Sequence, residues 1–114
     1  MFEVGVDCVN VNRFDAKMPY IRIFTDSEIE YCQSKKRPSE HFAARFAAKE
    51  ATIKALSSVI SKLKLTDIQI LNDSFGKPFV KLNTNHPVNL KIKVSLSHTS
   101  ELAIASVIAY VGEK

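Results

Sequence analysis

One long helical pattern dominates this sequence. Pro38 precedes Ser39, a residue suited to the N-cap position, and the pattern predicts a helix from there to about Ser61. Apolar residues recur along one side of this helix, at Phe42, Phe46, Ile53, Leu56 and Ile60. A chain of 114 residues with one such helix has room for one core. We therefore expect a single domain over residues 1–114.

The segments before and after this helix alternate with the period of β-strands. The pattern predicts strands at residues 2–8, 68–70, 79–82, 91–97 and 102–111. The last of these is apolar almost throughout, which is typical of a central strand, and we expect it to pair with the strand before it. Thr25 and Glu28 have capping-box spacing and predict a short helix over residues 26–33. The predicted fold class is α+β, an antiparallel sheet packed on one long helix.

The composition of the chain favours some classes of binding partner but does not select one. The formal net charge of +4 and the isoelectric point near 9.1 favour an anionic partner, whether nucleotide, nucleic acid or acidic protein. A nucleic-acid-binding module is disfavoured because the chain has no tryptophan, no basic tail and no aromatic–basic motif. No apolar run could span a bilayer and no export signal begins the chain, so we expect a cytoplasmic protein without membrane contact. Cys8 and Cys32 are expected to be reduced core residues.

Two carboxylates fall at positions that call for an explanation. At about 100° per residue, Glu50 projects to the edge of the apolar side of the long helix, where a carboxylate must be paired or bound to a cation. Lys54 follows one turn later, so a Glu50–Lys54 ion pair is one alternative. Asp7 lies near the end of the first strand, where it caps a turn or binds a metal. Mg²⁺ takes one or two protein carboxylates, and this pair satisfies that number.

Basic residues gather near the start of the long helix. Arg45 and Lys49 stand four residues apart on one row, and Lys36 and Arg37 lie just upstream. Guanidinium and ammonium groups bind phosphate oxygens well, so this set forms either a phosphate cradle or a solvated basic face. His98 lies at the turn after the predicted strand 91–97, a position where a histidine is usually exposed. No hydrolase, zinc or glycine-rich phosphate-loop motif is present.

Three segments, taken in this order, resemble the holo-[acyl-carrier-protein] synthase family of 4′-phosphopantetheinyl transferases. The first is Gly5-Val6-Asp7 with a later Arg13, the second is Phe46-Ala47-Ala48-Lys49-Glu50-Ala51 with Lys54, and the third is Ser95-Leu96-Ser97-His98. The similarity extends over nearly the whole chain, and the helix segment is its most specific part.

The resemblance implies an activity and a set of site residues. It implies transfer of the 4′-phosphopantetheine group of coenzyme A to a serine hydroxyl of an apo acyl carrier protein, with release of 3′,5′-ADP, as in fatty acid biosynthesis. Asp7 and Glu50 would bind Mg²⁺, and Lys54 would contact the coenzyme's pyrophosphate. Arg45, Lys49 and His98 would line the coenzyme pocket, with Arg45 and His98 nearest the 3′-phosphate and Lys36 a further candidate. Two alternatives remain for the base that takes the proton of the acceptor serine, Glu50 and a metal-bound water.

The resemblance also implies a homotrimer with active sites between subunits. This chain differs from the family pattern in two places. The family carries a glycine-rich stretch after its helix motif, whereas this chain continues Leu56-Ser57-Ser58-Val59-Ile60, so we expect a differently shaped coenzyme pocket. The carrier-docking segment is short, and its basic residues are Arg13, Lys17 and Arg22, which leaves the acceptor open. The alternatives are an inactive interaction domain with this fold and, less favoured, a nucleic-acid-binding module.

Overall fold

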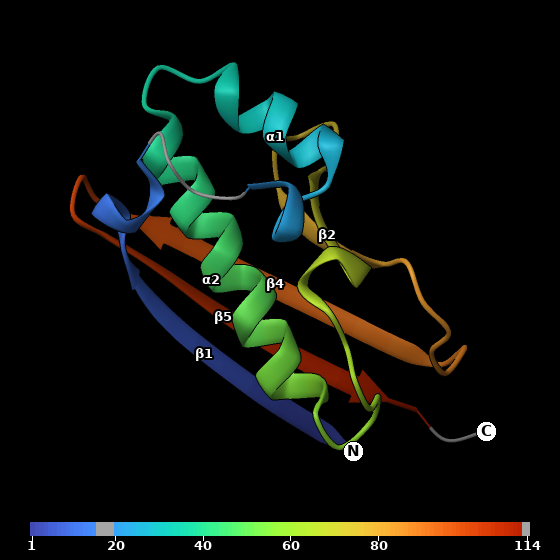
Figure 1. Cartoon of the computed structure of the whole chain (residues 1–114). Coiled ribbons are helices and arrows are strands. Elements are labelled where there is room, and N and C mark those ends of the chain that lie inside the picture. Colours follow the sequence, from blue (N-terminus) through green and yellow to red (C-terminus); the bar gives the residue numbers. More distant parts are fainter. Residues whose placement is uncertain (16–19, 113–114) are drawn as a thin grey trace.

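A helix lies across one face of a three-stranded antiparallel sheet (Figure 1). The computed structural model of the chain describes residues 1–15 and 20–112. Its sheets contain β1 (Phe2–Asn10), β2 (Ile68–Asn72), β3 (Pro78–Leu82), β4 (Leu90–His98) and β5 (Leu102–Val111). Its helices are α1 (Asp26–Gln33), α2 (Pro38–Leu56) and the short 3₁₀ segments η1 (Val11–Phe14), η2 (Tyr20–Arg22) and η3 (Leu65–Asp67).

The strands form two sheets, whereas we expected one. The larger has the order β1-β5-β4, so β5 is the central strand and pairs with β4 as predicted. The smaller is the hairpin β2-β3. Its turn is stabilised by Asp73, whose carboxylate accepts the amides of Phe75 and Lys77, and by Gly76 at a φ of 82°. The α+β class is confirmed, with the hairpin as a second small sheet.

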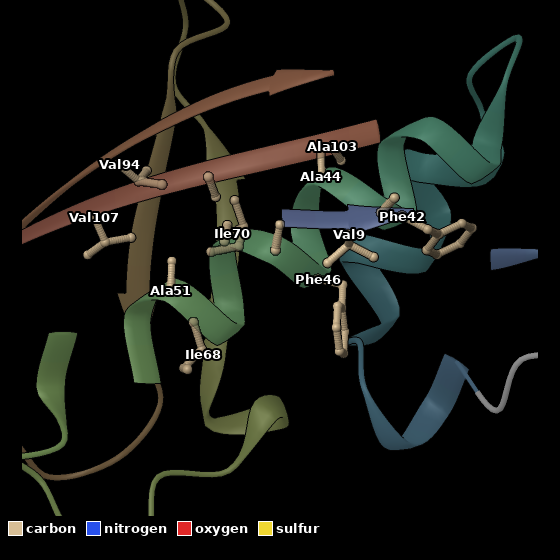
Figure 2. Packing of buried hydrophobic residues seen from close by; sticks show 14 of the residues in the cluster. Val9, Phe42, Ala44, Phe46, Ala51, Ile68, Ile70, Val94, Ala103 and Val107 are labelled. Atoms are coloured by element: carbon tan, nitrogen blue, oxygen red, sulfur yellow. The ribbon is translucent and has the colours of Figure 1, made fainter. Parts of the chain in front are cut away.

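Small residues let α2 approach the large sheet closely. Ala44, Ala47, Ala48, Ala51 and Ala55 are buried along the helix, and alanines of β5 are buried beneath it. A Cβ atom on Gly5 of β1 would lie 1.9 Å from the carbonyl oxygen of Ala51. Glycine is therefore required at the point where β1 and α2 cross. The phenyl rings of Phe42 and Phe46 fill one end of this core beside Val9, and Val94 and Val107 fill the other (Figure 2).

The long helix differs from its prediction at both ends. It begins at Pro38, with Arg37 at the N-cap, and the hydroxyl of Ser39 instead donates to the carbonyl of Phe14 at 2.6 Å. It ends at Leu56, five residues before the predicted Ser61. Val59 and Ile60 still pack on the core, but from a turn outside the helix, which explains why the apolar pattern extended the prediction.

The apolar face of β1 points away from the helix. Gly5 and Val9 face α2 and are buried, whereas Phe2, Val4 and Val6 are 50% to 71% exposed. Ile104 and Ile108 of β5 continue this outer apolar face. The orientation follows from the contact of Gly5 with the helix, because adjacent side chains of a strand point to opposite faces.

The two cysteines differ in burial. Cys32 lies in the core, where burial raises its pKa to about 12. Cys8 lies on the outer face of β1 and is exposed, so the prediction of a core residue was wrong for Cys8. Both are free thiols, as expected. No described helix is long and apolar enough to cross a membrane.

Candidate active site

Asp7 and Lys54 form the first part of the site. Asp7 projects from β1 toward α2, and its Oδ1 lies 3.1 Å from the Nζ of Lys54. The same ammonium group donates to the carbonyl of Val6 at 3.0 Å. The Asp7 side chain is 18% exposed and that of Lys54 is 53% exposed. A lysine has three N–H donors, so one remains available to an anionic ligand at this surface.

Glu50 lies one helical turn before Lys54 and therefore on the same side of α2. It is partly buried, as predicted from its helical position. Over residues 1–15 and 20–112 its carboxylate forms no hydrogen bond or ion pair, and the alternative of a Glu50–Lys54 pair is not realised because Lys54 binds Asp7 instead. A partly buried carboxylate without a counter-charge is suited to a cation.

The donor atoms at this position fit magnesium. Mg²⁺ uses one or two carboxylates and keeps its other octahedral positions for water and substrate phosphates. In the described part of the chain, no group of three or more His, Cys, Asp or Glu side chains is arranged to hold a metal. A metal ion at this site would depend on Asp7, on Glu50 and on oxygen atoms from a substrate.

Lys49 lies in the interior, which corrects the expectation that it lines a coenzyme pocket. Its side chain and that of Glu28 are both 0% exposed, and Nζ lies 2.6 Å from Oε1 of Glu28. Nζ also donates to the carbonyls of Ile23, at 2.8 Å, and Leu65, at 3.0 Å. Burial lowers the pKa of Lys49, and the ion pair with Glu28 opposes that shift. All three donors are occupied, so none remains for a ligand.

A pocket of about 180 Å³ lies near the start of α2, between α1, β4 and the β2–β3 hairpin. Arg45 forms one wall and is only 3% exposed. Its guanidinium lies 3.9 Å from the centre of the Tyr31 ring and donates a hydrogen bond to Asn72. Its Nε atom is buried and has no hydrogen-bond partner among the described residues. A buried donor without a partner is unusual in a protein, and here it belongs to a residue that lines the pocket.

The remaining basic candidates differ in position. His98 lines the pocket, and its Nδ1 lies 3.1 Å from Oε1 of Glu40. Lys36 is exposed in the turn before α2 and is not part of the pocket lining. Its neighbour Lys35 instead lies over the ring of Tyr31, at 4.5 Å from the ring centre.

Three residues that line the pocket were not predicted from the sequence: Tyr31, His41 and Asn72. They come from α1, α2 and β2, and only folding brings them together. The one available signal was that His41 lies four residues before Arg45, on the same side of a predicted helix. Nothing in the sequence around Tyr31 or Asn72 indicated a ligand.

The carboxylates and the pocket lie on opposite flanks of α2. Asp7 and Leu96, a pocket residue, both pair with Ala105 of the central strand, one from each side. They are thus separated by two strand spacings, about 10 Å, with the helix above the strand between them. Arg45 and Lys54 are nine residues apart, which at about 100° per residue also places them on opposite sides of the helix. Within one chain, α2 separates the two parts.

Comparison with known proteins shows the family of this chain. Residues 3–107 match the family described as the 4′-phosphopantetheinyl transferase superfamily. The chain is 45% identical to the holo-[acyl-carrier-protein] synthase of Chloroherpeton thalassium, over 93% of this chain and 95% of the relative. It is 38% identical to the enzyme of the same name from Geobacter sulfurreducens, over 95% and 96%.

Solved structures of similar proteins share the fold. A holo-(acyl-carrier-protein) synthase from Bacillus anthracis in complex with CoA (3′,5′-ADP) superposes with a TM-score of 0.80 and 32% identity, covering 94% of each chain. The Helicobacter pylori enzyme in complex with coenzyme A superposes with a TM-score of 0.78 and 31% identity, covering 94% of this chain and 99% of that one. This chain therefore belongs to the holo-[acyl-carrier-protein] synthases, enzymes of the 4′-phosphopantetheinyl transferase superfamily.

Proposed function

We propose that this enzyme transfers the 4′-phosphopantetheine group of coenzyme A to a serine hydroxyl of an apo acyl carrier protein and releases 3′,5′-ADP. The observation that carries the proposal is the ion pair of Asp7 and Lys54 on one flank of α2, with Glu50 one helical turn before Lys54. It offers carboxylates for a divalent cation and an ammonium group for a pyrophosphate. Relatives named for this reaction, and similar structures that contain coenzyme A, support the choice of substrates.

Asp7 and Glu50 are the proposed magnesium ligands. Their partial burial and the absence of a counter-charge on Glu50 within the described residues support this role. A bound Mg²⁺ would neutralise negative charge on the phosphate oxygens of the coenzyme. The protein's own contribution is to hold the two carboxylates in place, Asp7 through β1 and Glu50 through the adjacent helix.

Lys54 is the proposed pyrophosphate ligand. Its ammonium group is held by Asp7 and by the carbonyl of Val6, which leaves the third N–H for a phosphate oxygen. Phosphoryl transfer depends mainly on orienting the reacting groups and stabilising charge on the phosphate oxygens. A fixed cation at this position supplies both effects. In the reaction the serine hydroxyl gives up its proton to a base and its oxygen bonds to the β-phosphorus. The bond from that phosphorus to the bridging oxygen breaks, and that oxygen leaves with 3′,5′-ADP.

The pocket lined by Arg45 and His98 is the proposed site of the coenzyme's 3′-phosphate. Arg45 presents a buried donor without a partner, and a phosphate oxygen would satisfy it. Lys49 has no place in this proposal because its donors are used inside the protein. Lys36 is exposed and lies close in sequence to residues that line the pocket. It is a weaker candidate for the same phosphate.

The active site is proposed to be shared between copies of the chain in a homotrimer. One coenzyme cannot contact Lys54 and Arg45 of the same chain directly, because α2, about 10 Å across, stands between them. A second copy would supply the missing half. The outer apolar face of β1 and β5, with Phe2, Val4 and Ile104 exposed, supports an interface between copies, since monomers rarely expose contiguous apolar surface of this kind.

An apo acyl carrier protein is the proposed acceptor. Arg13 and Arg22 are exposed basic residues for an acidic surface, and Lys17 lies outside the described residues. Incubation of the enzyme with coenzyme A, Mg²⁺ and apo carrier protein should raise the mass of the carrier by one phosphopantetheine group, as measured by intact-protein mass spectrometry. An unchanged carrier mass, under conditions where a related synthase modifies the same carrier, would overturn the proposal in favour of an inactive interaction domain.

A further inference from the structure

Two imidazole rings face each other in the pocket near the start of α2. His41 projects from α2 and His98 from the end of β4, with ring centres 5.3 Å apart and ring planes at 63°. The centre of the Tyr31 ring lies 6.0 Å from that of His41. The proposed function uses His98 but assigns nothing to His41.

The pocket is built to receive an acceptor group. Arg45 is more than nine-tenths buried, and its Nε donor lacks a partner among the described residues. Tyr31 and Asn72 hold the guanidinium in place by stacking and by a hydrogen bond. His41 lies four residues before Arg45 and lines the same pocket. An anion that satisfies Arg45 therefore lies within reach of an imidazole that is otherwise unused.

The groups around His41 favour the neutral form of its ring before a ligand binds. Burial lowers the pKa of His41 most, and the nearby charges of His98, Arg45 and Lys35 lower it further. Glu40 acts in the opposite direction. The carboxylate of Glu40 is already engaged, at 3.1 Å from His98 and 3.6 Å from Arg37.

We propose that His41 is a further coenzyme-binding residue, which becomes protonated and contacts the phosphate monoester when that group enters the pocket. The inference rests on the proposed placement of the 3′-phosphate beside Arg45 and His98. It adds His41 to that site. It also predicts that the protein takes up a proton from solvent when the coenzyme binds.

The chemistry of a phosphate monoester explains the uptake. Its second pKa is near 6, so at neutral pH it carries a charge between −1.5 and −2. That charge reverses the electrostatic environment of His41 and favours the imidazolium form.

Nuclear magnetic resonance titration of the histidine rings tests the proposal in the intact protein. The chain has three histidines, and single His→Gln variants assign their signals. Saturation with adenosine 3′,5′-bisphosphate should raise the pKa of His41 by about one unit, equivalent to about tenfold tighter binding to the protonated form. Adenosine 5′-monophosphate, which lacks the 3′-phosphate, should leave it nearly unchanged. An unchanged His41 pKa with bisphosphate bound would overturn the proposal.

Calorimetry gives an independent measurement. Bisphosphate binding at pH 7, measured in two buffers of different ionisation enthalpy, should show proton uptake that falls in His41→Gln. The matched control His86→Gln changes an exposed histidine of the loop before β4 and should retain the parent uptake. Equal uptake in parent and His41→Gln would overturn the assignment of His41.

The two proposals fail differently. If the carrier protein is modified and bisphosphate binds without a change at His41, only the role of His41 is wrong. If bisphosphate does not bind at all, the phosphate pocket and the role of His41 are both wrong. If bisphosphate binds with proton uptake at His41 but no carrier is modified, the pocket assignment holds and the transferase proposal fails.

Discussion

The ion pair between Lys49 and Glu28 shows how a motif residue can serve the fold. Each oxygen of Glu28 accepts a backbone amide, from Thr25 and from Ile70, in addition to the lysine. Each N–H of Lys49 is also used. The pair therefore joins α1, α2 and β2 at one point, and it fixes the helix that carries both Arg45 and Glu50.

Replacement of Lys49 by methionine tests this role. Lys49→Met leaves the Glu28 carboxylate buried without its cation, which should reduce the free energy of unfolding by about 3–5 kcal/mol. Urea denaturation measures the change. The control Lys81→Met removes an exposed lysine of β3 and should change stability by no more than about 0.5 kcal/mol. A loss below about 1 kcal/mol for Lys49→Met would show that the pair is not structural.

Residue patterns predicted some site positions and missed others for a physical reason. Periodicity indicated that Glu50 is partly buried, and the structure confirms it. The same periodicity placed Lys49 on a row with Arg45 but could not show that Glu28, on another helix, meets it. Long-range partners depend on how elements pack, and spacing along the chain does not contain that information.

At the scale of elements, the contact between α2 and β1 positions the carboxylates. The contact depends on Gly5, where a Cβ atom would also lie 2.9 Å from the backbone nitrogen of Ala55. Both obstructing atoms belong to the helix backbone and cannot rotate away. The close approach brings Asp7 within reach of Lys54. The glycine and the aspartate two residues later thus form one structural unit.

Gly5→Ala should separate β1 from α2. We expect the free energy of unfolding to fall by about 2–3 kcal/mol, the usual cost of overpacking, together with a loss of transfer activity because Asp7 moves away from the helix. Thermal unfolding and the carrier mass assay measure the two effects. Gly112→Ala is the matched control, since the atoms nearest to its Cβ atom would be one of the Tyr110 ring, at 3.4 Å, and two of Asn89, at 3.9 Å. Equal stability of both variants would contradict this account of Gly5.

The ends of the helices and the orientation of the strand faces were harder to predict than which helices and strands are present. The short helix at 26–33 and its capping box are confirmed. The long helix was overextended because Val59 and Ile60 continue its apolar spacing from a turn. The outward face of β1 is unusual, because an apolar face normally turns toward the core, yet Gly5 directs the other face to α2.

At the scale of the whole molecule, the position of α2 between the carboxylates and the pocket predicts a site shared between subunits. Asp7→Ala disables the carboxylate part of the site and His98→Ala disables the pocket part, so each variant alone should have little transfer activity. Mixed oligomers that contain both variants should regain activity, because one interface then combines two intact halves. Co-expression with two affinity tags isolates such oligomers for the carrier mass assay.

Activity of the mixed oligomers that merely equals the sum of the two variants would contradict a shared site. Light scattering on each preparation shows whether the copies associate, which keeps a failure of assembly separate from a failure of complementation. The exposed apolar face of β1 and β5 leads us to expect association of the parent protein at micromolar concentration.

Asp7 and Glu50 are proposed to hold the magnesium ion needed for transfer, and the metal dependence of carrier modification shows whether they do. The parent should lose activity with a chelator and recover it with Mg²⁺, whereas Asp7→Asn and Glu50→Gln should need far more metal or stay inactive. Glu3→Gln is the matched control, a carboxylate on the same face of β1, and it should follow the parent. Full activity of both site variants at limiting Mg²⁺ would contradict the claim.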